Sequence, residues 1–135
     1  MLFRSPAARQ RLLDSVSSRK IANPVVLGGD VHSFNVNQLK ADFDRPDSPV
    51  VASEFVCTSV TSQAWAQERL NQYLPDNPHM LLVDSRYRGY ARVDVTAGRM
   101  SVDLRAMENV QNRGAACNTL ATYVVENGKP GPLKA

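Results

Sequence analysis

The sequence predicts an α/β fold that becomes β-rich in its second half. Three observations lead to this prediction: an amphipathic stretch near the N-terminus, a short apolar run directly after it, and two alternating runs later in the chain. A helix joined closely to an apolar strand is typical of α/β proteins. Strict alternation of apolar and polar residues is typical of half-buried strands. With 135 residues the chain is expected to form one domain, spanning residues 1–135.

The first helix is predicted to begin after Ser5, a good N-cap residue, with Pro6 at its first position. Its apolar face is expected to consist of Ala8, Leu12, Leu13 and Val16. Asn23-Pro24 is expected to end the helical region, because a residue before proline disfavours the helical conformation. The apolar run at 25–27 then follows as a strand, which we expect to be buried.

Further elements follow along the chain. Residues 34–43 and 50–59 are expected to be extended, and 61–74 is expected to be helical. The residues of this helix expected to face the core are Trp65, Leu70 and Tyr73. Spacing of this kind is more typical of core packing than of a cofactor site.

The second half carries the clearest β pattern. Residues 80–83 form a short apolar run, and the alternating runs at 90–95 and 100–104 are separated by a turn. Two such runs joined by a short turn predict a β-hairpin. Residues 120–125 are expected to form a last strand, and 128–135 a mobile tail rich in glycine and proline.

Composition excludes several functions. The net charge of +3 is spread along the chain, so no nucleic-acid partner is predicted. No stretch approaches the ~20 consecutive apolar residues of a membrane span. Residues 1–6 lack a basic region followed by an apolar core, so they are not a secretory signal as they stand. Cys57 and Cys117 are far apart and are expected to be free thiols.

The loop after the first strand is the most informative segment for function. Gly28 and Gly29 are expected to form a sharp turn, and Asp30 and His32 follow at once. Loops at the carboxyl ends of strands are where open α/β sheets bind ligands. If the backbone stays extended, residues two apart point the same way, and both side chains would face one metal cluster. From the residues alone, Asp30 as a turn cap and His32 as a structural histidine remain open.

Several segments in register resemble a known family, the PhoD-like alkaline phosphatases. The first resembles the last metal-binding motif of that family, and the others resemble the segments after it. They are residues 23–34, 48–59, 77–79, 84–90 and 93–96. The resemblance covers nearly the whole chain. It implies the C-terminal portion of a calcineurin-like metallophosphoesterase sandwich, in which two sheets pack between helical layers.

The resemblance also implies an activity, which is hydrolysis of phosphate esters at an iron–calcium centre. It places Asp30 on the calcium side and makes His32 a ligand of the ferric ion. These donors suit those ions, because carboxylates bind calcium well and imidazole is a good iron ligand. Such metals would polarise the phosphoryl oxygens and supply a hydroxide. Members of the family are usually exported to the periplasm or cell exterior.

The remaining ligands of such a centre lie upstream in the family. We therefore expect the chain to be a C-terminal fragment whose partner is a missing N-terminal part of the same domain. Catalytic and substrate-binding residues are not assigned. The alternative is a non-catalytic β-rich fragment or interaction module without a complete metal site. A third possibility is docking onto a separately encoded half, which requires exposed apolar surface on the strand at 25–27.

The chain departs from the family pattern at Asn35, where an aromatic residue is usual, and at Cys57, where glycine is common. Asn35 is expected to alter the wall of the pocket. His79 is interpreted as a loop residue. Arg86 and Arg88 either hold a phosphate or form a solvated pair on an edge strand. Two further acidic residues are interpreted as extra oxygen ligands or as part of a turn, namely Asp42 and Asp44.

Overall fold

The structure is a computed structural model that describes residues 5–135. Its elements are α1 (Pro6–Ser18), β1 (Val25–Gly28), β2 (Phe34–Lys40), β3 (Val50–Val56), α2 (Gln67–Asn71), β4 (Met80–Asp84), β5 (Arg88–Val95), β6 (Arg99–Met107), β7 (Cys117–Glu126) and β8 (Leu133–Lys134). The expectation about a secretory signal falls mainly on residues 1–4, which lie outside the described residues. Neither described helix is long and apolar enough to cross a membrane.

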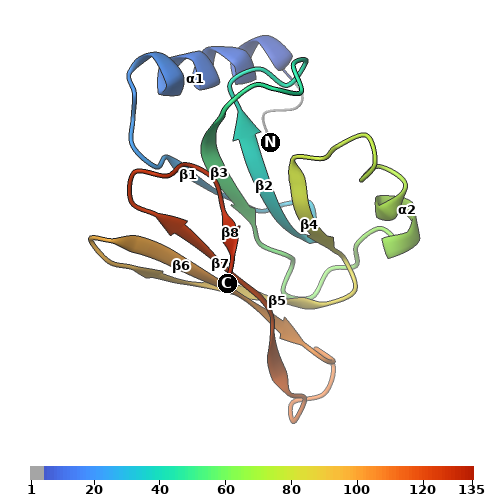
Figure 1. The fold of residues 1–135 in the computed structure, drawn as a ribbon. Coiled ribbons are helices and arrows are strands. Elements are labelled where there is room, and N and C mark those ends of the chain that lie inside the picture. The colour runs from blue at the N-terminus through green and yellow to red at the C-terminus, as the bar shows by residue number, and fades with distance from the viewer. Residues whose placement is uncertain (1–4) are drawn as a thin grey trace.

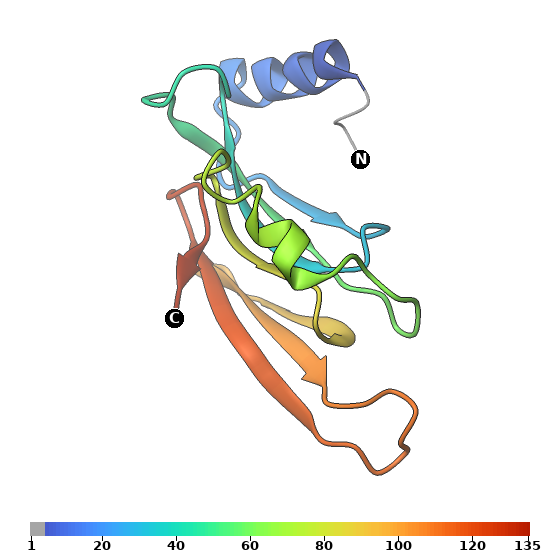
Figure 2. The same cartoon turned by 90° about the vertical axis from the view of Figure 1, so that its right-hand side faces the viewer.

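The strands of the described chain form two four-stranded sheets (Figure 1). The first sheet has the order β1-β3-β2-β4, with β1 parallel to β3 and the other pairs antiparallel. The second sheet is antiparallel throughout, in the order β5-β6-β7-β8. Figure 2 shows the sheets as separate layers, with α1 on the side of the first sheet that faces away from the second.

The hydrophobic core lies between the two sheets. The first sheet contributes Phe34, Val36 and Phe55, all fully or almost fully buried. The second sheet contributes alternate residues of β6 and β7, namely Val102, Leu104, Ala106, Ala121, Tyr123 and Val125. Side chains alternate across a strand, so the neighbouring residues of β2 and β3 point to the opposite face, toward α1. The outer face therefore carries polar residues such as Asn35, Asn37 and Glu54.

The first helix confirms the predicted cap and corrects the predicted face. The Ser5 side chain accepts a hydrogen bond from the Ala8 amide, as an N-cap residue should. Leu13 is buried, as expected, whereas 42% of Leu12 is exposed. The expectation that Leu12 shares the packed face is wrong, because α1 lies against β3 with Leu13 buried and Leu12 turned to the surface.

The strand at 25–27 is present as β1, but it is not buried. Within the described residues β1 pairs with β3 alone, which places it at the edge of the first sheet. Leu27 is 61% exposed. An apolar run of this length does not reveal how many neighbours its strand will have, so the prediction of burial is wrong.

The helix predicted at 61–74 is much shorter in the structure. Only Gln67–Asn71 is helical, and the rest of the segment is irregular. Trp65 and Tyr73 are 58% and 48% exposed, so the expectation that they face the core is wrong. The Arg69 guanidinium covers the Trp65 ring from 4.1 Å, which accounts for an aromatic side chain on this surface.

The second half follows the predicted pattern closely. β5 and β6 form the expected hairpin, and β7 contains the predicted strand at 120–125. In the segment 128–135, Gly131 and Pro132 are buried and β8 pairs with β7. The backbone of this segment is therefore held in the second sheet, and its mobility stays a prediction.

Candidate metal-binding loop

The loop at residues 29–33 connects β1 to β2. Because β1 and β3 run parallel, this loop lies beside the segment that follows β3, at the same edge of the first sheet. The Cys57 amide donates to the Gly28 carbonyl over 2.9 Å and continues the pairing to the start of the loop. The fold thus places Asp30 and His32 where parallel strands commonly present ligand-binding residues.

The backbone of this loop is not extended. Asp30 and His32 have positive φ angles of 78° and 57°. Aspartate and histidine enter this left-handed region more readily than most residues, but each such conformation costs on the order of 1–3 kcal/mol. The premise that an extended backbone turns both side chains the same way is therefore wrong. Gly28 is the last residue of β1 and the bends begin at Asp30, so the chain turns after the two glycines and not at them.

The strained loop is held through the His32 carbonyl. Nη1 of Arg88 donates to this oxygen over 2.8 Å, and Oγ1 of Thr58 lies 3.0 Å from it. Both of these residues are buried. Because they come from beyond β3 and from β5, the conformation of the loop depends on long-range contacts.

The His32 ring has a defined orientation. Its Nδ1 lies 2.7 Å from the carbonyl oxygen of Gln63. A carbonyl can only accept, so Nδ1 must carry the hydrogen and donate it. In the neutral ring this leaves the lone pair on Nε2, which is the arrangement seen when a second partner orients a metal-ligating histidine.

Asp30 is exposed at the surface of the loop. Within residues 5–135, no group of three or more His, Cys, Asp or Glu side chains lies close enough together to hold a metal ion. The loop therefore offers one carboxylate and one oriented imidazole, which suit a metal in kind but fall short of a full ligand set.

Arg86 and Arg88 have different environments and are not a solvated pair. The Arg86 guanidinium is exposed and bonds to the buried carboxylate of Asp84 at 2.5 and 3.0 Å. The Arg88 side chain is buried and contacts the loop instead. The expectation of a solvated edge pair is therefore wrong for Arg88.

Two other sequence candidates have structural roles. The Asp44 amide donates to the Asp42 carboxylate over 2.9 Å, which confirms a turn at these residues. The free thiols are also confirmed, since neither Cys57 nor Cys117 is bonded to another cysteine. Burial raises the pKa of the Cys57 thiol, which favours the protonated form over the nucleophilic thiolate.

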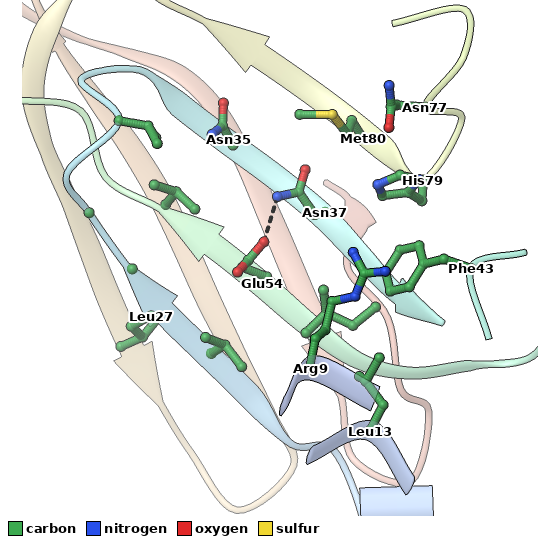
Figure 3. Close-up of a pocket in the computed structure, with 16 residues that line it drawn as sticks. Arg9, Leu13, Leu27, Asn35, Asn37, Phe43, Glu54, Asn77, His79 and Met80 are labelled. Atoms are coloured by element: carbon green, nitrogen blue, oxygen red, sulfur yellow. Dashed lines mark hydrogen bonds between the residues drawn. The ribbon is translucent and has the colours of Figure 1, made fainter. Parts of the chain in front are cut away.

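A cavity of about 440 Å³ lies between α1 and the outer face of the first sheet (Figure 3). Asn37 donates through Nδ2 to the Glu54 carboxylate over 2.7 Å, and within the described chain its buried Oδ1 has no partner. The lining of the cavity therefore combines acceptors, on Asn37 and Glu54, with a donor on Arg9, whose buried Nε has no partner within the described chain. Neither Asp30 nor His32 lines this cavity.

Asn35 also lines this cavity, from β2, and the Ser33 hydroxyl donates to its Oδ1 over 3.2 Å. His79 lines the other side, where its ring packs edge-on against Phe43 with the centroids 4.8 Å apart. Burial, together with the nearby charges of Lys40 and Arg9, lowers the pKa of His79. His79 therefore lines the cavity under α1 and is not part of the candidate metal-binding loop at residues 29–33.

Sequence reasoning missed the residues that support the loop. Thr58, Gln63 and Arg88 contact His32 from 26, 31 and 56 positions away. No local pattern links residues so far apart. The only available signal was the presence of Thr58 and Arg88 within segments that resemble the family.

The comparisons with known proteins agree on one family. A sequence model described as PhoD-like phosphatase matches residues 5–104. Alkaline phosphatase D of Bacillus subtilis (strain 168) is 36% identical over 132 residues, which cover 96% of this chain and 22% of that protein. A solved structure titled "Structure of PhoD" has a TM-score of 0.86 and 37% identity, and the match covers 96% of this chain and 25% of that one.

This match confirms the predicted fold class, an α/β portion of that fold with two sheets and a β-rich second half. The chain spans about a quarter of the length of these relatives. The family match covers most of the described residues and includes the loop with Asp30 and His32. The chain therefore belongs to the PhoD-like phosphatase family.

Proposed function

We propose that this chain contributes the last metal-binding loop of a phosphoesterase, with Asp30 and His32 as metal ligands. The observation that carries the proposal is the His32 ring, whose Nδ1 donates to the Gln63 carbonyl and leaves Nε2 for a metal. The strained backbone at Asp30 and His32 supports it, because strain of this kind gathers at functional sites. Family membership supplies the reaction class, which is hydrolysis of phosphate esters.

The proposed metals are ferric iron at His32 and calcium at Asp30. Their donor types fit, since imidazole binds iron and carboxylate oxygen binds calcium. When bound, such a centre polarises the phosphoryl group and supplies a hydroxide nucleophile. The role of this chain is to hold the two donors, one as a neutral imidazole in a fixed tautomer and the other as an exposed carboxylate.

The proposal assigns the remaining metal ligands to another polypeptide segment, the rest of the family domain. This chain covers 22% of alkaline phosphatase D. β1 lies at the edge of its sheet with Leu27 exposed, which suits docking of a further strand beside the loop. Export to the periplasm or cell exterior, as is usual in the family, is part of the same proposal.

A second candidate is a non-catalytic β-rich module. The observation that favours it is that the core between the two sheets contains neither Asp30 nor His32. Such a module would keep its stability when either residue is replaced. The experiment below distinguishes the metal-binding part of a phosphoesterase from a non-catalytic module.

The test is a chimera in which the matching segment of the Bacillus subtilis alkaline phosphatase D is replaced by this chain. Hydrolysis of a chromogenic phosphate monoester and of a diester is measured with ferric iron and calcium supplied. We expect activity, and a loss of at least ~100-fold in Asp30→Ala and His32→Ala, because even outer partners of metal ligands cost 10–100-fold. The matched controls, Asp44→Ala and His79→Ala, are expected to retain activity.

A folded, active chimera that tolerates Asp30→Ala and His32→Ala would contradict the ligand assignment. The isolated chain is assayed in parallel and is expected to be inactive. Activity in the isolated chain, lost in both variants, would instead show that the other segment is unnecessary. A folded but inactive chimera would favour the non-catalytic module.

A further inference from the structure

We propose that Arg88 is a positioning residue for His32, fixing both the backbone of this ligand and the acceptor that orients its ring. The inference rests on the proposed function in one respect, because it takes His32 to be a metal ligand. Arg88 lies on β5 in the second sheet, whereas His32 lies in the loop between β1 and β2 of the first sheet. The Arg88 side chain thus links the second sheet to the loop at residues 29–33.

The direct link is a fork of hydrogen bonds. Nη1 of Arg88 donates to the His32 carbonyl over 2.8 Å, and Nη2 donates to the Ser85 carbonyl over 2.5 Å. The rigid, planar guanidinium therefore holds two backbone oxygens at a fixed separation. One of these oxygens belongs to the residue with φ of 57°.

An indirect link runs to the His32 ring. Nη1 of Arg88 also lies 3.2 Å from Oγ of Ser59, and this hydroxyl donates to the Ser62 carbonyl over 2.5 Å. The next carbonyl along the chain, that of Gln63, accepts from Nδ1 of His32. The amide of Gly89 donates to the Ser59 carbonyl over 3.2 Å and ties the same segment to β5. Arg88 thus supports the ligand from both sides.

Thr58 closes the arrangement. Its hydroxyl lies 3.0 Å from the His32 carbonyl, 3.1 Å from the Tyr87 carbonyl and 3.3 Å from Nη1 of Arg88. The hydroxyl accepts from Arg88 and donates to one of the two carbonyls, so it transmits the position of β5 to the loop. Serine would preserve this geometry, and valine would remove it without changing the size of the side chain much.

The contacts of Arg88 argue for positioning rather than for binding a substrate phosphate. Its four polar contacts are carbonyl and hydroxyl oxygens, and its side chain is buried. Within residues 5–135 the ion pairs of arginine involve Arg45, Arg86 and Arg92 instead. A buried guanidinium engaged by backbone oxygens has little capacity left for a ligand. Its charged hydrogen bonds join the loop at His32 to the segment at Ser85.

The test uses the isotopically labelled, metal-free chain. Backbone order parameters are measured for residues 29–33, and ring ¹⁵N shifts give the tautomer of His32 about two pH units above the ordinary histidine pKa of ~6.5. We expect order parameters near 0.85 and an Nδ1–H tautomer in the parent chain. In Arg88→Lys the order parameters should fall below about 0.6 and the tautomer should become mixed, because lysine cannot span both carbonyls.

Thr58→Val is the second variant, in case Arg88→Lys does not fold, and is expected to loosen the loop in the same way. Thr58→Ser is expected to restore the parent values. Arg86→Lys, the neighbouring exposed arginine, is the matched control and should leave both readouts unchanged. A folded Arg88→Lys or Thr58→Val chain with parent order parameters and tautomer would overturn the inference.

A metal arm separates this inference from the proposed function. Co²⁺ binding to each chain is followed through the paramagnetic shifts of the His32 ring. We expect Arg88→Lys to weaken binding by roughly 10–100-fold, the usual loss when an outer partner of a ligand is removed. If the parent chain shows no Co²⁺ shift at His32, the two donors of the loop do not hold the ion without the remaining ligands, and the order parameters and the tautomer alone decide whether Arg88 positions the loop.

Discussion

Gly89 lies so close to Arg105 that a β carbon added at Gly89 would stand 1.9 Å from the Arg105 carbonyl oxygen. The contact joins the first residues of β5 to β6, next to Arg88. Backbone atoms cannot move aside as a flexible side chain can. We therefore expect Gly89→Ala to lower the free energy of unfolding by about 1–3 kcal/mol, as overpacking does, measured by urea denaturation. Gly98→Ala is the control, because no atom lies within 4 Å of its added Cβ, and equal losses in both variants would contradict the close approach.

The different environments of two aromatic residues predict contrasting losses of stability when each is replaced by alanine. Phe55 is 2% exposed in the core, so Phe55→Ala is expected to cost about 3–5 kcal/mol of unfolding free energy. Trp65 is 58% exposed and forms a cation–π pair with Arg69, so Trp65→Ala should cost less than about 1 kcal/mol. Denaturation of both variants measures the difference. A loss of several kcal/mol for Trp65→Ala would restore the view that it belongs to the core.

The positive φ of Asp30 predicts that glycine and alanine at this position differ in their effect on stability but not in their effect on metal affinity. Glycine adopts φ near 78° without steric cost, so Asp30→Gly should be more stable than Asp30→Ala by about 1 kcal/mol. Both variants lack the carboxylate and should lose metal affinity to the same extent. Denaturation in the presence of a chelator, followed by metal titration, checks both parts. Equal stability of the glycine and alanine variants would show that the loop is not strained at this position.

The environment of His79 predicts a pH dependence of stability. Burial above all, and then the charges of Lys40 and Arg9, lower its pKa from 6.5, while Glu54 opposes them. Between the lowered pKa of the folded state and the ordinary pKa of the unfolded state, the unfolded chain binds more protons. Stability therefore rises with pH across this window and is lost as the pH falls from about 6.5. The unfolding free energy of the parent minus that of His79→Gln, measured against pH, should fall toward acid, and a constant difference would contradict the shift.

Patterns that depend on neighbouring residues predicted the second half of the fold well. In β5, Ala91 and Val93 alternate with Arg92 and Asp94, and the hairpin follows directly from that alternation. The N-cap at Ser5 was equally visible, because a cap acts over three residues. These features are local, so a single sequence contains all the information that they need.

Features that depend on which surfaces are covered were not predictable. Helical spacing placed Trp65 and Leu12 on apolar faces, yet both are exposed, because the spacing does not specify what covers a side chain. Trp65 also lies outside the short helix α2. The same reason explains the exposure of Leu27, since the apolar run does not specify the neighbours of β1. Periodicity predicts a face but not what packs against it.

In the candidate site, too, the local features were predictable and the long-range contacts were not. The types and order of Asp30 and His32 were enough to propose a metal loop, but not to predict its left-handed backbone. That conformation is supported by Thr58 and Arg88, whose contacts with His32 cross 26 and 56 positions of sequence. Long-range support of this kind cannot be read from one sequence, since no local rule connects the partners.

The edge position of β1 has a consequence for how the chain behaves in solution. An exposed edge strand presents unpaired amides and carbonyls that act as a template for another strand, and the exposed Leu27 adds an apolar contact. Copies of the chain can therefore extend their sheets into one another as concentration rises. A strand supplied by the rest of the domain would complete the sheet beside the candidate metal-binding loop and remove this route to self-association. The unpaired edge of β1 would therefore serve two ends: it would receive the rest of the domain in the proposed metal centre, and, left uncovered, it would promote aggregation.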